Sequence, residues 1–94
     1  MAWNKLSSYR TSIESDYDHP LIVRYHKTAI VKRDNAGVIT LNSGGWRTVT
    51  TKRKMNQASH QFGLGYGVFQ KDFDWYVDFN GATVEFEDGM ELKP

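Results

Sequence analysis

The chain of 94 residues contains no cysteine and no long apolar run. Without cysteine it can have no disulfide framework, thiolate zinc site, iron–sulfur cluster or cysteine nucleophile. No apolar run approaches the roughly 20 residues that a helix needs to cross a bilayer. The polar residues that follow Met1 lack the pattern of a signal peptide. The sequence therefore predicts one small cytoplasmic domain with no membrane segment.

Aromatic residues and charge are distributed in an informative way. Five Phe, three Trp and five Tyr are enough to fill a small core, which argues against disorder along the whole length. Residues 72–94 contain seven acids and one lysine, a net charge of −6, whereas residues 1–71 have a net charge of +7. This asymmetry predicts one anionic and one cationic surface, unless the two halves pack together and partly neutralise each other.

Runs of β-branched and aromatic residues predict two antiparallel meanders. The predicted strands are residues 21–26, 28–33 and 38–41 in the first meander, and 66–70, 75–79 and 82–86 in the second. A hairpin turn is expected at 34–37, where Asn35 and Gly37 can adopt positive φ. Asn80-Gly81 is the strongest hairpin signal in the chain.

A helix is predicted between the meanders, over roughly 52–62, with Thr50 or Thr51 as its N-cap and glycines stopping it at 63 and 65. Met55, Ala58 and Phe62 form its apolar stripe. The expected partners of that stripe are Trp75, Val77, Phe79, Ala82, Val84 and Phe86.

The predicted fold class is α+β: an antiparallel β-meander, one main α-helix and a second antiparallel β-meander, packed as a single sheet-plus-helix domain over 21–94. Residues 1–20 are expected to be a polar N-terminal arm. A short helix is an option there, because four apolar residues recur at intervals of three or four. These residues are Trp3, Leu6, Tyr9 and Ile13.

A basic cluster opens the predicted helix. Lys52, Arg53 and Lys54 fall in its first turn, where the helix dipole disfavours each exposed cation by about 0.3–1 kcal/mol. An arrangement that opposes local stability suggests function, and free N–H groups, hydroxyls and cations together suit a phosphate. Exposure to solvent, or pairing with the acidic half, would explain the cluster equally well. The candidate ligand-binding residues are Gly44, Gly45, Trp46, Arg47, Thr50, Thr51, Lys52, Arg53, Lys54 and Asn56.

Each candidate has an expected role. Trp46 would stack on a base beside the bidentate donor Arg47, although a lone Trp in a short loop more often belongs to the core. Gly44 and Gly45 would let the backbone approach the ligand closely. Asn56 lies one turn after Lys52 on the same helix face. Asparagine is unfavourable in the middle of a helix, which suggests that Asn56 has a functional role.

Catalytic and metal-binding patterns are missing. The three histidines, His19, His26 and His60, show no metal-ligand spacing, and no nucleophile elbow is present. A metal-free ribonuclease that uses two of the histidines and a lysine is an open alternative with nothing to support it. The sequence predicts a protein without a metal, a cofactor or enzymatic activity.

The segment 40–48, Thr-Leu-Asn-Ser-Gly-Gly-Trp-Arg-Thr, and the segment 50–56, Thr-Thr-Lys-Arg-Lys-Met-Asn, resemble small uncharacterised accessory proteins of tailed bacteriophages and prophages. The segments 68–71 and 75–77 are similar as well. The resemblance implies a phage setting and an accessory, non-virion role in the bacterial host cell. Proteins of that class commonly block host enzymes or defences, including by sequestering nucleotide signals. The resemblance implies no catalytic residues.

The resulting expectation is a non-enzymatic phage accessory protein, for host takeover or anti-defence. It would bind a phosphorylated small molecule or a nucleic acid at the basic helix N-terminus. The alternative is a protein–protein inhibitor that acts like a DNA mimic on a host protein. Its carboxylates would be Asp72, Asp74, Asp78, Glu85 and Glu87. A homo-oligomer is also left open, because a small domain with free strand edges can gain core by self-association.

Overall fold

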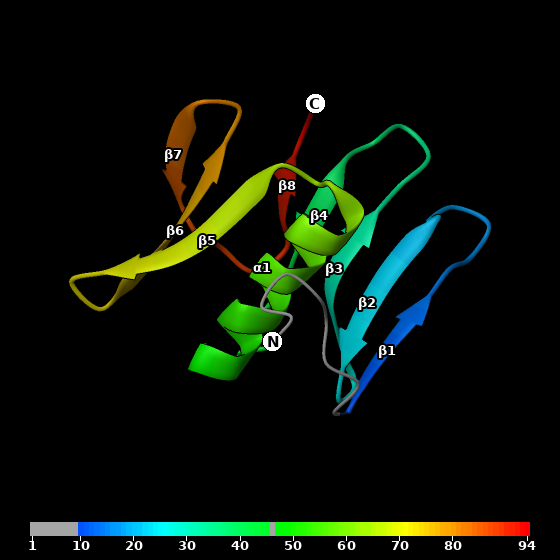
Figure 1. Ribbon diagram of the computed structural model, residues 1–94, viewed down its shortest axis with the longest axis horizontal. Coiled ribbons are helices and arrows are strands. Elements are labelled where there is room, and N and C mark those ends of the chain that lie inside the picture. The colour runs from blue at the N-terminus through cyan, green and yellow to red at the C-terminus, as the bar shows by residue number, and fades with distance from the viewer. Residues whose placement is uncertain (1–9, 46) are drawn as a thin grey trace.

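The computed structural model describes residues 10–45 and 47–94, which form two antiparallel sheets and one helix (Figure 1). The first sheet contains β1 (Thr11–Glu14), β2 (Leu21–Tyr25), β3 (Thr28–Arg33), β4 (Ile39–Leu41) and β8 (Met90–Leu92), in the order β1-β2-β3-β4-β8. The second contains β5 (Tyr66–Lys71), β6 (Asp74–Phe79) and β7 (Ala82–Glu85), in that order. Helix α1 (Val49–Phe62) lies between the sheets in the sequence. The predicted α+β class is therefore confirmed, with the two meanders in separate sheets.

The six predicted strands are present, within two residues of their expected bounds. Two further strands were not predicted. Strand β8 pairs with β4, with Leu92 opposite Ile39 and Met90 opposite Leu41, so the chain returns to the first sheet after completing the second. Three residues are too short a run to show a periodic pattern, and the pairing partner is about fifty residues away in the sequence.

Strand β1 lies within the segment that was expected to be a polar arm. It pairs with β2, with Ile13 opposite Val23, so the helix considered for this region is wrong for Thr11–Glu14. Pairing with the edge of β2 supplies backbone hydrogen bonds, and these outweigh the helical tendency that the apolar spacing suggested. The other residues of that spacing, Trp3, Leu6 and Tyr9, lie outside the described residues.

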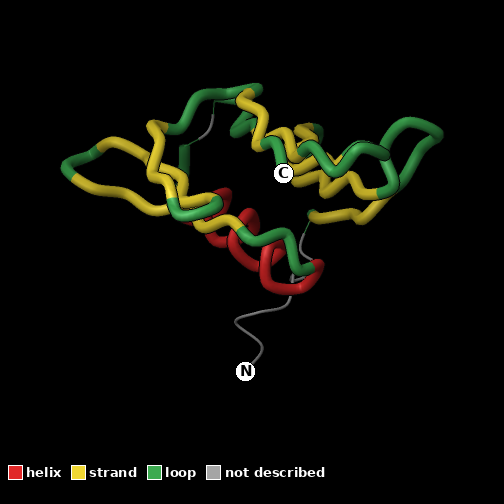
Figure 2. The backbone as a smooth tube through the Cα atoms, turned by 90° about the horizontal axis from the view of Figure 1, so that it is seen from above, coloured by secondary structure: helices red, strands yellow, loops and turns green. Residues whose placement is uncertain are grey.

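The helix joins the two sheets. Figure 2 shows the sheets extending to opposite sides of the molecule with α1 between them at the centre, and α1 packs against both β5 and β3. Met55 and Ala58 of the predicted stripe are fully buried, and Phe62 is partly buried against the same core. Gly63 ends the helix as predicted, with φ +64 and its N–H donating to the Ser59 carbonyl.

The expected partners of the stripe are only partly correct. Trp75, Val77 and Phe86 are buried, and the rings of Trp75 and Phe86 meet edge to face with centroids 5.4 Å apart. Ala82 and Val84, however, are exposed. Both belong to β7, the edge strand of the second sheet, on the far side of β6 from the strand that contacts α1. Sharing a sheet face with buried residues does not bring them under the helix.

Buried polar groups fix α1 to β5. The Ser59 hydroxyl donates to the Tyr66 carbonyl (2.6 Å) and accepts from the Tyr66 N–H (3.1 Å). The Tyr66 hydroxyl donates to the Met55 carbonyl at 2.6 Å. Burial raises the pKa of Tyr66, which keeps the phenol protonated as that donor. Among the described residues, no helix is long and apolar enough to cross a membrane.

Candidate functional site

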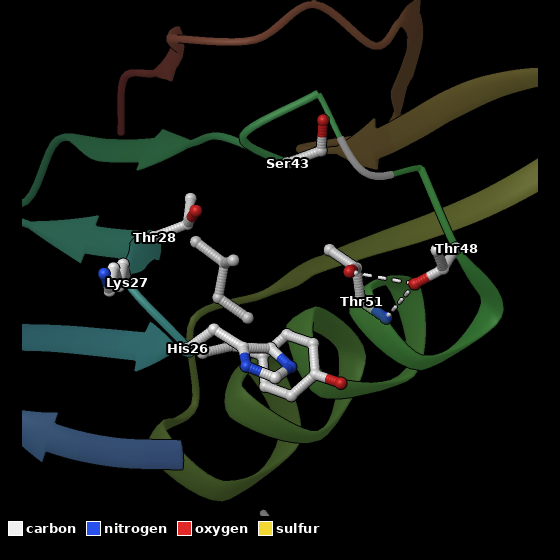
Figure 3. Close-up of a pocket in the computed structure, with 8 residues that line it drawn as sticks. His26, Lys27, Thr28, Ser43, Thr48 and Thr51 are labelled. Carbon is white, nitrogen blue, oxygen red and sulfur yellow. Dashed lines mark hydrogen bonds between the residues drawn. The ribbon is translucent and has the colours of Figure 1, made fainter. Parts of the chain in front are cut away.

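A cavity of about 480 Å³ opens where the first turn of α1 faces the first sheet (Figure 3). This volume falls in the range of small-molecule sites. The wall comes from three segments: the β2–β3 turn with the adjoining strand residues, the loop after β4, and the start of α1. The lining residues are Tyr25, His26, Lys27, Thr28, Ile30, Ser43, Thr48 and Thr51.

Thr48 starts the helix at this cavity. Its φ of −100° and ψ of 162° are extended, and its side chain accepts a hydrogen bond from the Thr51 N–H at 3.2 Å. The two hydroxyls of Thr48 and Thr51 are 3.1 Å apart (Figure 3). The predicted N-cap, Thr50 or Thr51, is therefore wrong. A cap contributes about 1 kcal/mol, which offsets the few tenths that each β-branched residue costs inside a helix, so the helix begins at Val49.

The cations of the predicted cluster point in different directions. Arg53 is exposed, Lys52 is half-buried and Lys54 is buried. Consecutive helical residues are about 100° apart around the axis, so three in a row cannot share one face. The Lys54 ammonium lies 5.1 Å from the centroid of the Tyr25 ring, and burial lowers the pKa of Lys54. Lys54 thus places a positive charge behind one wall of the cavity.

Gly44 brings the loop after β4 against the first sheet. Its φ is +66°, and a β-carbon there would lie 2.5 Å from the Thr28 hydroxyl. The glycine was expected to let a ligand approach the backbone, but its neighbour is Thr28, a lining residue. Gly45 has φ +83° with open space beside it. The close approach at Gly44 therefore shapes the cavity.

A carboxylate holds the same loop from the other side. Oδ1 of Asp88 accepts from the Ser43 hydroxyl at 2.6 Å and from the Ser43 N–H at 2.8 Å. Partial burial alone would raise the pKa of Asp88, but the two Ser43 bonds, the Arg47 charge and the Gly45 N–H together lower it. The segment between β7 and β8 thereby fixes the loop that carries Ser43.

Arg47 and Asn56, both candidate ligand residues, have partners inside the protein. The Arg47 guanidinium lies 5.2 Å from the centroid of the Phe86 ring and donates to the Phe86 carbonyl at 3.5 Å. The Asn56 amide donates to the Val68 carbonyl (2.8 Å) and accepts from the Val68 N–H (2.7 Å). Asn56, whose place in mid-helix suggested a role, thus connects α1 to β5.

Of the ten predicted site residues, Thr51 lines the cavity and Lys54 supports it from behind Tyr25. Gly44 shapes it, Gly45 and Thr50 are exposed nearby, and Trp46 lies outside the described residues. Tyr25, His26 and Lys27, which form the β2–β3 turn at the cavity, were not among the predicted site residues. The signal for this turn is weak: a histidine and a lysine interrupt two β-branched runs, and His26 takes φ +55° to turn the chain.

A second cavity, of about 390 Å³, lies near the other end of the helix, where Gly63 and Leu64 form part of its wall. The C-terminal end of a helix carries a partial negative charge, so this cavity is the poorer place for an anion. Among the described residues, no group of three or more His, Asp or Glu side chains could hold a metal ion. The cavity at the start of α1 is the candidate functional site.

Comparisons with known proteins give one result. No curated protein and no solved structure matches the chain. The family model described as Kyanoviridae Gp96 protein matches residues 1–93. Kyanoviridae are cyanophage myoviruses, so the match supports the phage setting that the resemblance implied. The chain belongs to the Kyanoviridae Gp96 protein family.

Proposed function

We propose that this phage protein is a non-enzymatic accessory protein that binds a phosphorylated, nucleotide-like molecule in the cavity at the start of α1. The observation that carries the proposal is the convergence on one cavity of a helix N-terminus, an aromatic wall and basic side chains. The first turn of a helix leaves backbone N–H groups without intrahelical partners, and its dipole favours an anion.

The lining divides the cavity into two kinds of surface. Tyr25 and Ile30 offer flat apolar contact for a base or another ring. The Thr51 hydroxyl and the Lys27 ammonium at the β2–β3 turn offer donors for a phosphate, whereas the Ser43 hydroxyl already donates to Asp88. Lys54, behind Tyr25, adds to the positive potential. An anionic group would therefore face the helix and a ring would face the sheet.

The size of the cavity favours a mononucleotide over a nucleic acid strand. A volume of about 480 Å³ suits one small molecule, whereas single strands are bound along extended basic grooves with several stacking platforms. Arg47, which was expected to extend the binding surface, is instead occupied at Phe86.

The test is a titration with a panel of nucleoside mono-, di- and triphosphates, cyclic nucleotides, inorganic pyrophosphate and a short oligonucleotide. Calorimetry measures affinity, and native mass spectrometry of protein purified from host cells shows any retained ligand. We expect one nucleotide class to bind and raise the melting temperature. Lys27→Gln should weaken that binding about 10-fold, as the loss of a charged hydrogen bond predicts.

Lys93→Gln is the matched control, because it removes the same charge at an exposed position outside the cavity. If no member of the panel binds at millimolar concentration, or if both lysine variants bind equally well, the cavity does not bind a phosphorylated ligand. If the oligonucleotide is the one member of the panel that binds, the ligand is a nucleic acid and not a nucleotide.

The alternative function, inhibition of a host protein through the acidic meander, has one favourable observation. All five carboxylate residues proposed for it are exposed: Asp72, Asp74, Asp78, Glu85 and Glu87. Exposed carboxylates could replace phosphates in a basic groove on a nucleic-acid-binding protein. In that case Lys27→Gln would leave the activity unchanged, whereas replacing the aspartates by asparagine would abolish it.

A further inference from the structure

The hairpin between β5 and β6 ends in a turn with unusual chemistry. Lys71 pairs with Asp74, so the turn contains only two residues, Asp72 and Phe73, with φ of +52° and +71°. Positive φ at both central residues is the type I′ geometry that matches the twist of a hairpin. Figure 1 shows this hairpin extending away from the body of the molecule.

The next hairpin supplies an internal comparison. Phe79 pairs with Ala82, and the two turn residues, Asn80 and Gly81, have φ of +52° and +80°. The two turns therefore have closely similar backbones, and Phe73 occupies the position that glycine occupies in the other one. Positive φ is a rare and unfavourable conformation for a bulky side chain.

Among the residues that the structure describes, no packing of the Phe73 ring compensates for this strain. The Phe73 side chain is 95% exposed, so it contributes little to the core. The molecule thus bears both a strained backbone and an apolar ring in water at one position. Strain of this kind is typical of functional sites, and an exposed aromatic at a projecting tip is typical of an interface anchor.

We propose that Phe73 is the anchor by which this protein binds a partner protein that has an apolar pocket with a basic rim. The basic rim follows from the net negative charge of the tip, where the exposed carboxylates of Asp72 and Asp74 flank the ring and outnumber the one cation, Lys71. The same charges disfavour insertion into an anionic membrane surface. The proposal does not rest on the ligand cavity, and it differs from nucleic acid mimicry because the apolar anchor, and not the acidic surface, provides most of the affinity.

The first experiment asks whether Phe73 serves the fold. Phe73→Gly should raise the melting temperature by about 4 °C, because glycine adopts the required φ without strain. Tyr17→Ser is the control: Tyr17 is 94% exposed, is not among the positive-φ residues, and its replacement should leave the melting temperature unchanged. A lower melting temperature for Phe73→Gly would show that the ring stabilises the fold and would overturn the proposal.

The second experiment identifies the partner. Benzoylphenylalanine, a photo-cross-linker, is placed at position 73 or, as a control, at position 17, and the protein is irradiated in a lysate of host cells. We expect one discrete product from position 73 that position 17 does not give. The cross-linked protein is then purified and titrated with the wild type and three variants.

Phe73→Gly should weaken the affinity for the purified partner about 30-fold, as expected for a central anchor, and Tyr17→Ser should leave this affinity unchanged. Asp72→Asn with Asp74→Asn should weaken it less and reduce its dependence on salt. The proposal fails if no specific product forms, if both positions give the same product, or if the product is a second copy of this chain. It also fails if Phe73→Gly binds normally, or if the ring instead drives sedimentation with phosphatidylcholine–phosphatidylserine vesicles.

Discussion

Gly44 and Gly45 are adjacent residues with positive φ, yet only Gly44 is crowded. Replacing Gly45 by alanine adds backbone strain of about 1 kcal/mol, because φ is +83° there. It adds no steric clash, because the β-carbon would meet open space. The same change at Gly44 adds that strain and forces the loop away from Thr28. We expect Gly44→Ala to lower the free energy of unfolding by about 2–3 kcal/mol in urea titrations. Equal losses for the two variants would show that the contact with Thr28 is unimportant.

Asp88 should make the free energy of unfolding depend on pH. Its pKa is lowered in the folded protein from the ordinary 3.8, so its contribution is fully present above that value. The contribution is lost as the pH falls below 3.8 through the lower folded-state pKa. Asp88→Asn should therefore destabilise the protein at neutral pH and flatten its loss of stability in acid. Urea titrations between pH 7 and pH 2 measure both effects, and parallel pH profiles for the two proteins would contradict this role.

Among the secondary structure elements, α1 depends on its first residues. Thr48→Ala removes the oxygen that accepts from the Thr51 N–H, and should cost about 1 kcal/mol of unfolding free energy. Thr50→Ala is the control, because Thr50 is exposed in the same turn and does not cap the helix. Alanine favours helix, so Thr50→Ala should leave the stability unchanged or slightly increased. Circular dichroism during urea unfolding distinguishes the two variants.

The elements differ in how far the sequence could predict them. Local patterns were sufficient for six strands, for the Asn80-Gly81 turn and for the end of α1 at Gly63, because neighbouring residues decide those features. Strand β8 depends on pairing with distant β4, and the exposure of Val84 depends on which strand α1 covers. The cavity combines residues from 25 to 51, so its composition follows from tertiary packing, and only Thr51 among its lining residues was predicted.

At the scale of the whole molecule, β8 connects the end of the second sheet to the first. Leu92 is 4% exposed and lies in the core that includes Ile39 and Met55. Leu92→Ala should lower the unfolding free energy by about 2–5 kcal/mol. Because the two sheets share this core, hydrogen exchange of amides in β5 and β6 should accelerate as well. Val84→Ala, at 43% exposure, is the control and should change exchange little.

An effect of Leu92→Ala confined to the first sheet would contradict this coupling. It would mean that the two sheets unfold separately.

The position of β8 beside β4 also has a consequence for synthesis. The first four strands leave the ribosome before α1 and the whole second sheet, while residues 90–92 come much later. Until then, the hydrogen-bonding groups along one side of β4 have no strand beside them, and such an edge can pair with other chains. The β4 edge of the nascent protein is therefore open to aggregation from the time β4 emerges from the ribosome until β8 emerges and pairs with it. Its solubility in the cell should depend on how quickly that interval is completed.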